Sequence, residues 1–352
     1  MVLSRSPRCD PMSKKQASPT SVDFALNYAM VLGKSRPHRL TIVLIQSSRE
    51  SFMQTSICRE PRTKLSRSSL FMLGVIWIAN AQINSNAVAQ EPLLKPNDRI
   101  AILGGTLVER MQRSGAVEAE LQARRPDWKL TVRNLGWSGD DVHGLARKVF
   151  DNPEAGFARL LRDVQTADPT VVLVAYGFAE ASDGPPAVDR FEPGLNRLLD
   201  ELTKQKRRII LLSPFAMPGV QSPGYDQSMS RCQQIVGAVA QSRNLAVITT
   251  NWVPQTADLT EDQLHPSELG FEHLADPLAD RLVGGKSPSE MHPLLKKKIV
   301  AKNQLFFHRY RPQNETYLFL FRKHEQGNNA SEIPEFDPLI QAADEQIWMA
   351  AR

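Results

Sequence analysis

Five short apolar runs recur along the chain, and segments with the residue spacing of amphipathic helices separate them. The runs lie at residues 100–104, 130–135, 171–175, 209–212 and 246–250. The helical patterns cover about residues 107–124, 154–166, 188–205, 227–243 and 267–283. Apolar runs of strand length that alternate with helices are typical of a parallel sheet covered by helices on both faces. The sequence therefore predicts an α/β fold, a three-layer α/β/α sandwich with a five-stranded, mainly parallel sheet.

The residues before this pattern have the order of charges and apolar residues found in a secretory leader. Residues 1–90 contain 12 Lys and Arg against 4 Asp and Glu, whereas the remaining 262 residues contain 31 against 34. Lys64 and Arg67 precede an uncharged apolar stretch of ten residues at 70–79, and Ala87-Val88-Ala89 follows it. Such a stretch is too short to span a bilayer. A positive region, a short apolar region and a small-x-small site in this order indicate a signal peptide.

We expect this signal peptide to occupy residues 53–89, because a start at Met53 makes a leader of ordinary length. The mature protein would then begin near Gln90 and be exported to the periplasm or the extracellular space. Residues 1–52 are interpreted as an over-extended, disordered N-terminus. The alternative is a genuine disordered extension with an internal anchor.

The composition of the mature part argues against several classes of partner. Its near neutrality disfavours nucleic-acid binding, which needs a basic patch on the folded domain. Cys232 is its single cysteine and lies in a helical segment, so we expect a small core residue rather than a nucleophile. The mature part has no Cys/His spacing of a metal site, and the glycines at 104–105 lack the rest of a dinucleotide fingerprint. We expect no metal, no cofactor, no nucleic acid and no membrane span after signal cleavage.

The segment 99–110 has the pattern of a buried strand, a glycine turn and the start of a helix. Gly104 and Gly105 permit backbone angles that a residue with a Cβ resists. In a parallel sheet this arrangement places Thr106 at the carboxyl end of the strands, where open α/β folds bind ligands. The Thr106 hydroxyl is therefore a candidate reacting group. On this stretch alone the favoured interpretation is that Thr106 caps the helix, since Thr is a good N-cap residue.

A second candidate site, Asp262-Gln263-Leu264-His265, follows the last predicted strand. A carboxylate at this spacing before a histidine can accept the Nδ1 proton and fix the tautomer. Nε2 is then free to take a proton from a hydroxyl nucleophile. Because Pro266 is expected to start the next helix, His265 would lie at an exposed junction of loop and helix. The spacing favours a functional His265 over a structural one.

Four blocks of the sequence, taken in order, resemble the SGNH, or GDSL-like, hydrolases. The first block, Gly104-Gly105-Thr106-Leu107, corresponds to the family's Gly-Asp-Ser-Leu, and the second, residues 134–140, to its segment ending in Ser-Gly-Asp. The third block, Gly177-Phe178-Ala179-Glu180, corresponds to the family's Gly-x-Asn-Asp. The fourth, Asp262-Gln263-Leu264-His265, corresponds to its Asp-x-x-His. The resemblance covers about residues 97–285. It implies the flavodoxin-like SGNH fold and a hydrolase that acts on an ester, the acyl group of a carbohydrate or small molecule.

The resemblance also implies a role for each matching residue. Thr106 would attack the ester, with His265 as the base and Asp262 orienting it. The backbone N–H groups of Thr106 and Gly139 would bind the oxyanion. Further candidates for lining the cleft are Gly105, Asp140, Ala179 and Glu180.

Three of the departures from the family's pattern lie at or beside the nucleophile and at the oxyanion donor. Thr106 replaces the serine; its extra methyl restricts χ1, although a threonine hydroxyl can still act beside a base. Ala179 replaces the asparagine that donates to the oxyanion, and the loss of one such donor typically costs about 10²–10³ in rate. Gly105 replaces the aspartate before the nucleophile.

Two alternatives to an esterase with a threonine nucleophile stay open. In one, the domain has lost catalysis and binds a glycan or cell-envelope component, which the three departures favour. In the other, Asp140, Glu180 or Glu315 joins His265 to activate water directly.

The chain from about residue 288 onward differs in composition from the part before it. We therefore divide the mature part into a hydrolase domain at 90–287 and a helical, aromatic tail at 288–352. The aromatic residues between 306 and 321 need burial, so we expect the tail to pack on the domain as a clasp. It resembles the tail of a subgroup of exported bacterial SGNH-like proteins. A ligand cleft is the second interpretation, suggested by the polar residues His308, Arg309, Arg311, Asn314 and Glu315.

Overall fold

The computed structural model describes residues 91–352 except 221, 251, 253–256 and 289–291. The predicted signal peptide at 53–89 and the segment 1–52 lie outside the described residues. The described residues belong to one compact unit, Ala81–Arg352. Within them, each helix is either too short or too polar to cross a membrane.

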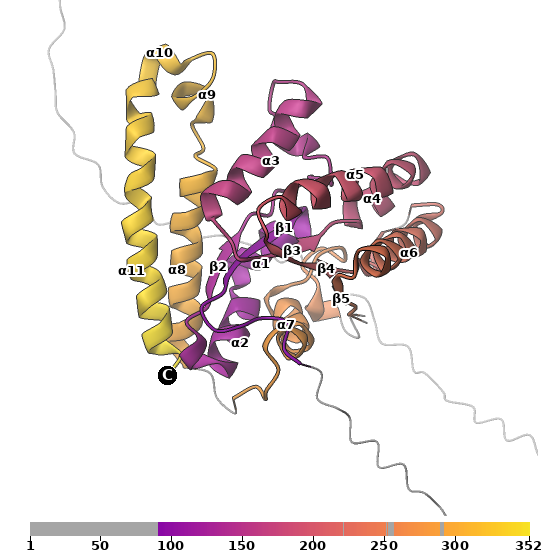
Figure 1. The fold of residues 1–352 in the computed structure, drawn as a ribbon, viewed down its shortest axis with the longest axis horizontal. Helices are drawn as coiled ribbons and strands as arrows, with labels where there is room; N and C mark the ends of the chain where they lie inside the picture. The colour runs from indigo at the N-terminus through magenta and orange to yellow at the C-terminus, as the bar shows by residue number, and fades with distance from the viewer. Residues whose placement is uncertain (1–90, 221, 251, 253–256, 289–291) are drawn as a thin grey trace, which may run out of the picture. The chain divides into compact units, whose positions relative to one another are not determined.

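The centre of this unit is a parallel sheet of five strands (Figure 1). The strands are β1 Arg99–Gly104, β2 Thr131–Asn134, β3 Val171–Ala175, β4 Arg208–Leu212 and β5 Ala246–Ile248, in the order β2-β1-β3-β4-β5. All four pairings are parallel, which confirms the predicted sheet. The direction of winding reverses between β1 and β3, and doubly wound folds bind ligands outside the carboxyl ends of such strands.

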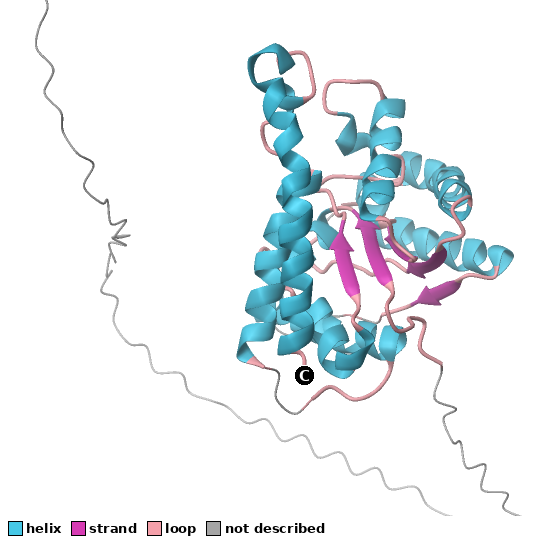
Figure 2. Ribbon diagram, turned by 60° about the vertical axis from the view of Figure 1, so that its left-hand side comes forward, coloured by secondary structure: helices cyan, strands magenta, loops and turns pink. Residues whose placement is uncertain are grey.

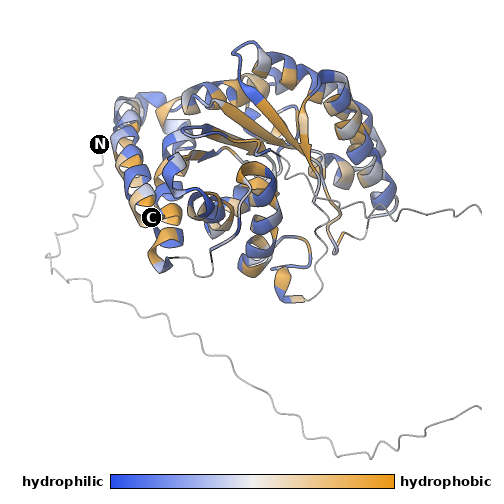
Figure 3. Cartoon of the chain, turned by 60° about the horizontal axis from the view of Figure 1, so that its bottom comes forward, coloured by the Kyte–Doolittle hydropathy of each residue, from blue (hydrophilic) through white to orange (hydrophobic). Residues whose placement is uncertain are grey.

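Helices cover both faces of the sheet and make it the middle layer of three (Figure 2). They are α1 Thr106–Ser114, α2 Ala116–Arg124, α3 Pro153–Ala167, α4 Phe178–Asp183, α5 Pro185–Thr203, α6 Tyr225–Arg243 and α7 Glu268–Val283. Along β1, Ala101 and Leu103 join the core formed with α3, α5 and α6, whereas Ile100 and Ile102 join the core formed with α1, α2 and α7. Side chains alternate along a strand, so a strand buried on both faces is apolar throughout. The strands β1, β3 and β4 are accordingly hydrophobic over most of their length, whereas the edge strand β2 includes Arg133 and Asn134 (Figure 3).

Single-turn 3₁₀ helices complete the connections between these elements. They are η1 Pro126–Trp128, η2 Leu145–Lys148 and η3 Ala257–Leu259, and a longer one, η4 Gly327–Glu335, lies near the C-terminus. Two of the predicted helices differ in the structure. The helix expected over 107–124 is split, because Gly115 adopts φ +67° between α1 and α2. The helix expected over 188–205 begins earlier, at Pro185, and the separate α4 precedes it.

Beyond α7, two long helices lie side by side next to the β2 edge of the sheet (Figures 1 and 2). The helices of this segment are α8 Pro293–Tyr310, α9 Glu315–Leu318, α10 Lys323–Gln326 and α11 Phe336–Ala350. Lys302 of α8 is fully buried, and its Nζ lies 2.7 Å from Glu118 Oε2 and 2.8 Å from the Val132 carbonyl oxygen. Arg133 of β2 pairs with Asp344 of α11. Buried charges of the segment are therefore neutralised by charges of the α/β layers.

Candidate active site

Thr106 lies where β1 passes into α1, at the carboxyl edge of the sheet. Gly105 is the N-cap of α1. A Cβ on Gly105 would lie 2.8 Å from the carbonyl oxygen of Asp140, closer than such atoms pack. A larger residue at 105 would therefore push the turn that contains Asp140 away from Thr106. The glycine that departs from the family's pattern is thus required here by close packing.

The interpretation of Thr106 as a helix cap is wrong. Thr106 is the first helical residue of α1, and no side chain caps this helix. Instead, Thr106 Oγ1 accepts a hydrogen bond from the backbone N–H of Gly139 at 3.0 Å. Gly139 has φ +73°, a conformation that favours glycine. The structure thus brings the first and second sequence blocks into direct contact at the hydroxyl.

His265 and Asp262 form the pair that their spacing predicts. His265 Nδ1 lies 2.8 Å from Asp262 Oδ2, and the backbone N–H groups of His265 and Leu264 donate to Oδ1 at 2.7 and 3.0 Å. Partial burial acts to raise the pKa of Asp262, but the hydrogen bonds from His265 and Leu264 outweigh it and hold this pKa well below its usual range. The carboxylate therefore stays ionised and fixes the imidazole with Nε2 free.

The start of the helix after His265 differs from the expectation. Pro266 forms an isolated bridge with Thr260, and α7 begins at Glu268. Ser267 is the N-cap, and its hydroxyl accepts the N–H of Gly270. The bridge closes the loop that carries Asp262 and His265, because the Glu261 N–H also donates to the His265 carbonyl oxygen at 3.0 Å.

Arg110 is a residue at this site that the sequence reasoning missed. Its Nη1 lies 3.2 Å from Asp262 Oδ2 and 3.0 Å from Glu261 Oε2. Arg110 follows Thr106 by one helical turn, so both lie on the same side of α1. The spacing of four residues from Thr106 is the signal in the sequence that Arg110 lies near the site. The acidic partners of Arg110 follow about 150 residues later, so only the fold identifies them.

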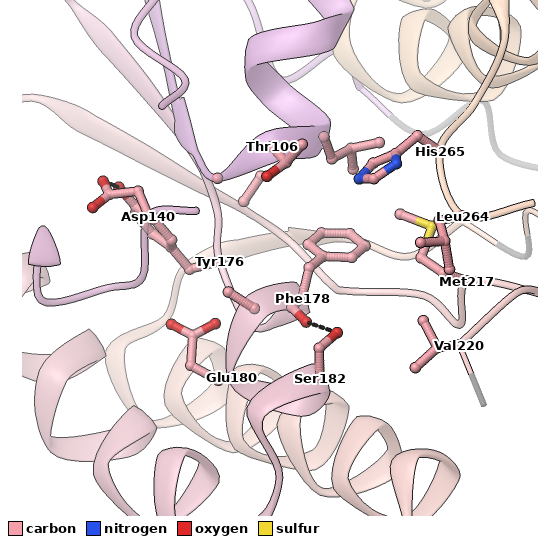
Figure 4. Close-up of a pocket in the computed structure, with 14 residues that line it drawn as sticks. Thr106, Asp140, Tyr176, Phe178, Glu180, Ser182, Met217, Val220, Leu264 and His265 are labelled. Carbon is pink, nitrogen blue, oxygen red and sulfur yellow. Dashed lines mark hydrogen bonds between the residues drawn. The ribbon is translucent and has the colours of Figure 1, made fainter. Parts of the chain in front are cut away.

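Thr106 and His265 line one cavity of about 210 Å³ (Figure 4). All four cleft candidates line it as well: Gly105, Asp140, Ala179 and Glu180. Apolar side chains form much of the rest of the wall: Leu107, Phe178, Met217, Val220 and Leu264. Among the described residues, no hydrogen bond joins Thr106 directly to His265. The hydroxyl is held by Gly139, and the imidazole lines the same cavity.

Asp140 is occupied by a buried ion-pair network. Its Oδ2 lies 2.7 Å from Arg147 Nε, and Tyr176 donates its hydroxyl to the same oxygen at 3.2 Å. Arg147 also pairs with Asp163 at 3.0 Å. Burial raises the pKa of Asp140 despite the adjacent Arg147 charge. Asp140 thus stabilises the turn after β2, and its contacts do not support the interpretation of it as a base beside His265.

Glu180 holds two loops of the site together. Its carboxylate accepts the N–H of Gly177 at 2.8 Å and that of Val142 at 2.9 Å. Burial raises its pKa to about 7, against the lowering effect of these hydrogen bonds. Glu315 pairs with Arg159 instead of approaching the cavity. The arrangement in which one of these carboxylates joins His265 to activate water is therefore not supported by their contacts.

We expect the ionisation of Glu180 to make the protein less stable as pH rises from 4.5 to about 7. In this interval the folded state keeps the Glu180 proton that the unfolded state has released, so the free energy of unfolding falls, by about 3 kcal/mol. Glu180→Gln cannot ionise and should lose this part of the pH dependence. Urea unfolding of both proteins at either end of the interval measures it, and an identical pH dependence in the two would contradict the assignment.

Ala179 contributes no hydrogen-bond donor from its side chain. It lies in the first turn of α4, after β3, and lines the cavity. Ser182, on the same helix, also lines the cavity, but its hydroxyl donates to the Phe178 carbonyl oxygen at 3.0 Å (Figure 4). Neither residue therefore offers the amide that the family's asparagine supplies.

The polar residues of the C-terminal segment are largely paired, some with each other and some with the α/β layers. Arg309 pairs with Asp337 and Arg311 with Glu109, while Asn314 Nδ2 lies 3.4 Å from Gln326 Oε1. A second cavity, of about 540 Å³, lies between α1 and α8 and is lined by His308 but by none of the other four polar residues considered for a ligand cleft. These contacts favour the clasp over the ligand cleft.

Cys232 lies on α6 and is fully buried in the core, as expected for a core residue. Burial raises the pKa of its thiol to about 12. A thiol with so high a pKa is a poor nucleophile. It is therefore not an alternative to Thr106.

Comparison with known proteins identifies the domain. Residues 103–273 match the sequence model of the GDSL-like Lipase/Acylhydrolase family. No curated protein matches the chain. This range contains all four blocks that bring Thr106, Gly139, Ala179 and the Asp262–His265 pair together.

Solved structures that resemble the chain include several esterases. An acetyl xylan esterase, AlAXEase, is 17% identical over 52% of this chain and 100% of its own, with a TM-score of 0.43. A catalytic mutant of Axe2, an acetylxylan esterase from Geobacillus stearothermophilus, is 21% identical over 56% and 100%, with a TM-score of 0.44. BT4096, a gut microbial diltiazem-metabolizing enzyme, is 14% identical with a TM-score of 0.42; the match covers 55% of this chain and only 48% of BT4096. From the family match over the four blocks, we conclude that residues 103–273 are a GDSL-like lipase/acylhydrolase domain.

Proposed function

We propose that the protein is an exported ester hydrolase that uses Thr106 as its nucleophile. The observation that carries the proposal is the position of the Thr106 hydroxyl. It is held by the Gly139 N–H on the wall of a cavity that His265 lines from another element, with Asp262 behind the imidazole. A hydroxyl, a base with a fixed tautomer and a backbone donor are the components of acyl transfer through a covalent intermediate.

In the first half of the reaction, Thr106 Oγ1 attacks the carbonyl carbon of the ester and its proton passes to His265 Nε2. The carbonyl oxygen becomes an oxyanion, which the backbone N–H groups of Gly139 and Thr106 stabilise. The Gly139 N–H donates a hydrogen bond to the Thr106 hydroxyl before substrate binds, so during attack this N–H must change its acceptor from the hydroxyl to the oxyanion. The intermediate then collapses, the C–O bond to the alcohol breaks, and His265 returns the proton to the leaving alkoxide.

In the second half, water attacks the acyl group on Thr106 and gives its proton to His265 Nε2. Collapse of the second intermediate releases the carboxylic acid, and the proton returns to Thr106 Oγ1. Asp262 stays ionised throughout and stabilises the imidazolium that forms in each half, because its pKa is held low by its hydrogen bonds.

The dimensions and walls of the cavity support a small acyl group. A space of about 210 Å³ with apolar side chains suits a short acyl chain, and the alcohol half of the ester would extend outward. We propose an acyl ester of a carbohydrate or another small molecule as substrate. Export is supported by the order of charged, apolar and small residues in 53–89. Cell fractionation and N-terminal sequencing test it; a chain that retains residues 1–89 in the cytoplasm would contradict it.

Hydrolysis of a short-chain aryl ester tests the proposed activity. We expect turnover by the wild type and an acyl adduct on Thr106 in rapidly quenched samples analysed by peptide mass spectrometry. His265→Ala should lose both, because neither attack nor release proceeds without the base. An adduct on another residue, or turnover that His265→Ala leaves unchanged, would contradict the proposal.

A binding domain without catalysis is the second candidate. Two observations favour it: Ala179 supplies no oxyanion donor, and no hydrogen bond links the described Thr106 and His265 side chains. It predicts saturable binding of an envelope glycan that survives His265→Ala. Esterase activity that depends on His265 would exclude it.

A further inference from the structure

The C-terminal segment contacts the turn that carries Gly139. We call residues 136–139 the oxyanion turn. Tyr310, at the end of α8, donates its hydroxyl to the carbonyl oxygen of Gly136 at 2.8 Å. Arg311 Nη1 lies 2.7 Å from Glu109 Oε2, and this same oxygen accepts the N–H of Ser138 at 2.6 Å. Two backbone groups of the turn are therefore held by Tyr310 and Arg311, one directly and one through Glu109.

Trp137, in the middle of the oxyanion turn, is packed against arginine side chains. The Arg311 guanidinium lies 3.7 Å from the centre of the indole ring and that of Arg159 lies 4.7 Å from it. Arg159 is in turn paired with Glu315 of α9. Trp137 is 5% exposed, so these cation–π contacts are shielded from water and strengthened. The C-terminal segment thus fixes the side chain of the turn as well as its backbone.

Gly139 itself has little that would hold it in place. No atom lies within 4 Å of the position that a Cβ on Gly139 would occupy, and its φ of +73° is one that glycine leaves easily. Its N–H makes the hydrogen bond to Thr106. The direction of that N–H therefore depends on how firmly its neighbours are anchored. On one side is Asp140, which Arg147 and Tyr176 hold. On the other side are Gly136, Trp137 and Ser138. The Trp137 N–H is anchored within the sandwich, to the Gly104 carbonyl oxygen at 3.0 Å.

We propose that Tyr310 and Arg311 are positioning residues: they hold the oxyanion turn so that the Gly139 N–H is directed at Thr106. The inference rests on the proposed function, in which this N–H stabilises the oxyanion. Donors contribute most when they are already oriented before charge develops. With Ala179 supplying no donor, the orientation of the Gly139 N–H has a correspondingly large effect on the rate.

The test measures the turn directly and does not depend on catalysis. Tyr310→Phe removes only the hydroxyl, and Arg311→Met keeps the length of the side chain while removing its charge and donors. Arg309→Met is the matched control, because Arg309 is the same residue type two positions earlier in the chain but pairs with Asp337 of α11. Hydrogen exchange by mass spectrometry on peptides that span 134–140 should be about 5-fold faster in Tyr310→Phe and faster still in Arg311→Met. It should keep the wild-type rate in Arg309→Met.

Ester hydrolysis then shows whether the position of the turn affects the reaction. The oxyanion bond forms only in the transition state, so Tyr310→Phe and Arg311→Met should lower kcat about 10-fold and leave KM nearly unchanged. Arg311→Lys, which retains the charge, should recover part of the loss. Burst titration corrects each rate for the fraction of active enzyme, so that simple unfolding is not counted.

The outcomes separate this inference from the proposed function. Wild-type exchange of the turn in both Tyr310→Phe and Arg311→Met would overturn the inference whether or not the protein is an esterase. An equal increase in Arg309→Met would also overturn it, because the effect would then be general loosening of the segment. Faster exchange with unchanged kcat in an active enzyme would overturn the catalytic consequence. If the wild type hydrolyses no ester, the proposed function fails, and the exchange data still decide how the turn is held.

Discussion

Thr106→Ala is expected to abolish ester hydrolysis, with kcat falling by about 10⁵ and the acyl adduct disappearing at the same time. The reason is that Thr106 Oγ1 accepts the Gly139 N–H, and that Thr106 lines the same cavity as His265. The fall in kcat follows from loss of the nucleophile, because a hydrolase without its nucleophile retains only what its oxyanion donors and binding contribute. Steady-state rates with an aryl ester, together with intact-mass analysis of quenched enzyme, measure both effects.

Thr106→Ser is the control for this substitution. It keeps the hydroxyl and removes the methyl group that restricts χ1, so turnover should be retained or increased. Circular dichroism should show that all three proteins are folded, since Thr106 is only partly buried. Turnover in Thr106→Ala at the wild-type rate would exclude Thr106 as the nucleophile. If Thr106→Ser is inactive while the wild type is active, the hydroxyl at position 106 is not acting as the nucleophile.

Ala179→Asn is expected to increase kcat by about 10²–10³, because the asparagine amide adds a hydrogen-bond donor for the oxyanion. Ala179 lies in the first turn of α4, at the carboxyl end of β3, and its side chain lines the cavity that contains Thr106. Because β1 and β3 are neighbours in the sheet, an amide there would face the same oxyanion as the Gly139 N–H. The gain should appear in kcat with little change in KM, because the new bond forms only in the transition state.

Ala179→Leu is the matched control, since leucine has as many side-chain heavy atoms as asparagine, branched at the same carbon, and no donor. It should not increase kcat, and it should raise KM if it narrows the cavity. An equal increase with leucine would mean that packing of the cavity, rather than a donor, limits the rate. No increase with asparagine, in a variant of unchanged stability, would mean that the oxyanion does not lie next to residue 179.

Much of the fold follows from local patterns in the sequence. The strands β1, β3 and β4 coincide with apolar runs because a parallel strand buried on both faces must be apolar along most of its length. The hydrogen bond between Asp262 and His265 follows from their spacing in one short loop. These features depend on neighbours within a few residues, and the sequence records such neighbours directly.

Other features depend on contacts between distant segments, and only the tertiary structure decided them. Thr106 has the side chain of a helix cap, yet its hydroxyl binds the Gly139 N–H, which lies 33 positions further along the chain. The break at Gly115 between α1 and α2 was not predicted, because the sequence there has the pattern of one continuous helix.

The site shows the same division. The sequence by itself determined the parallel α/β sheet, the order of the four blocks and the Asp262–His265 pair, because local periodicity and short spacings carry that information. The tertiary structure alone decided that Arg110 reaches Asp262 and that Tyr310 and Arg311 hold the oxyanion turn. The physical reason is that an isolated arginine or tyrosine is compatible with many partners, and packing of α1 and α8 against the sheet selects one of them.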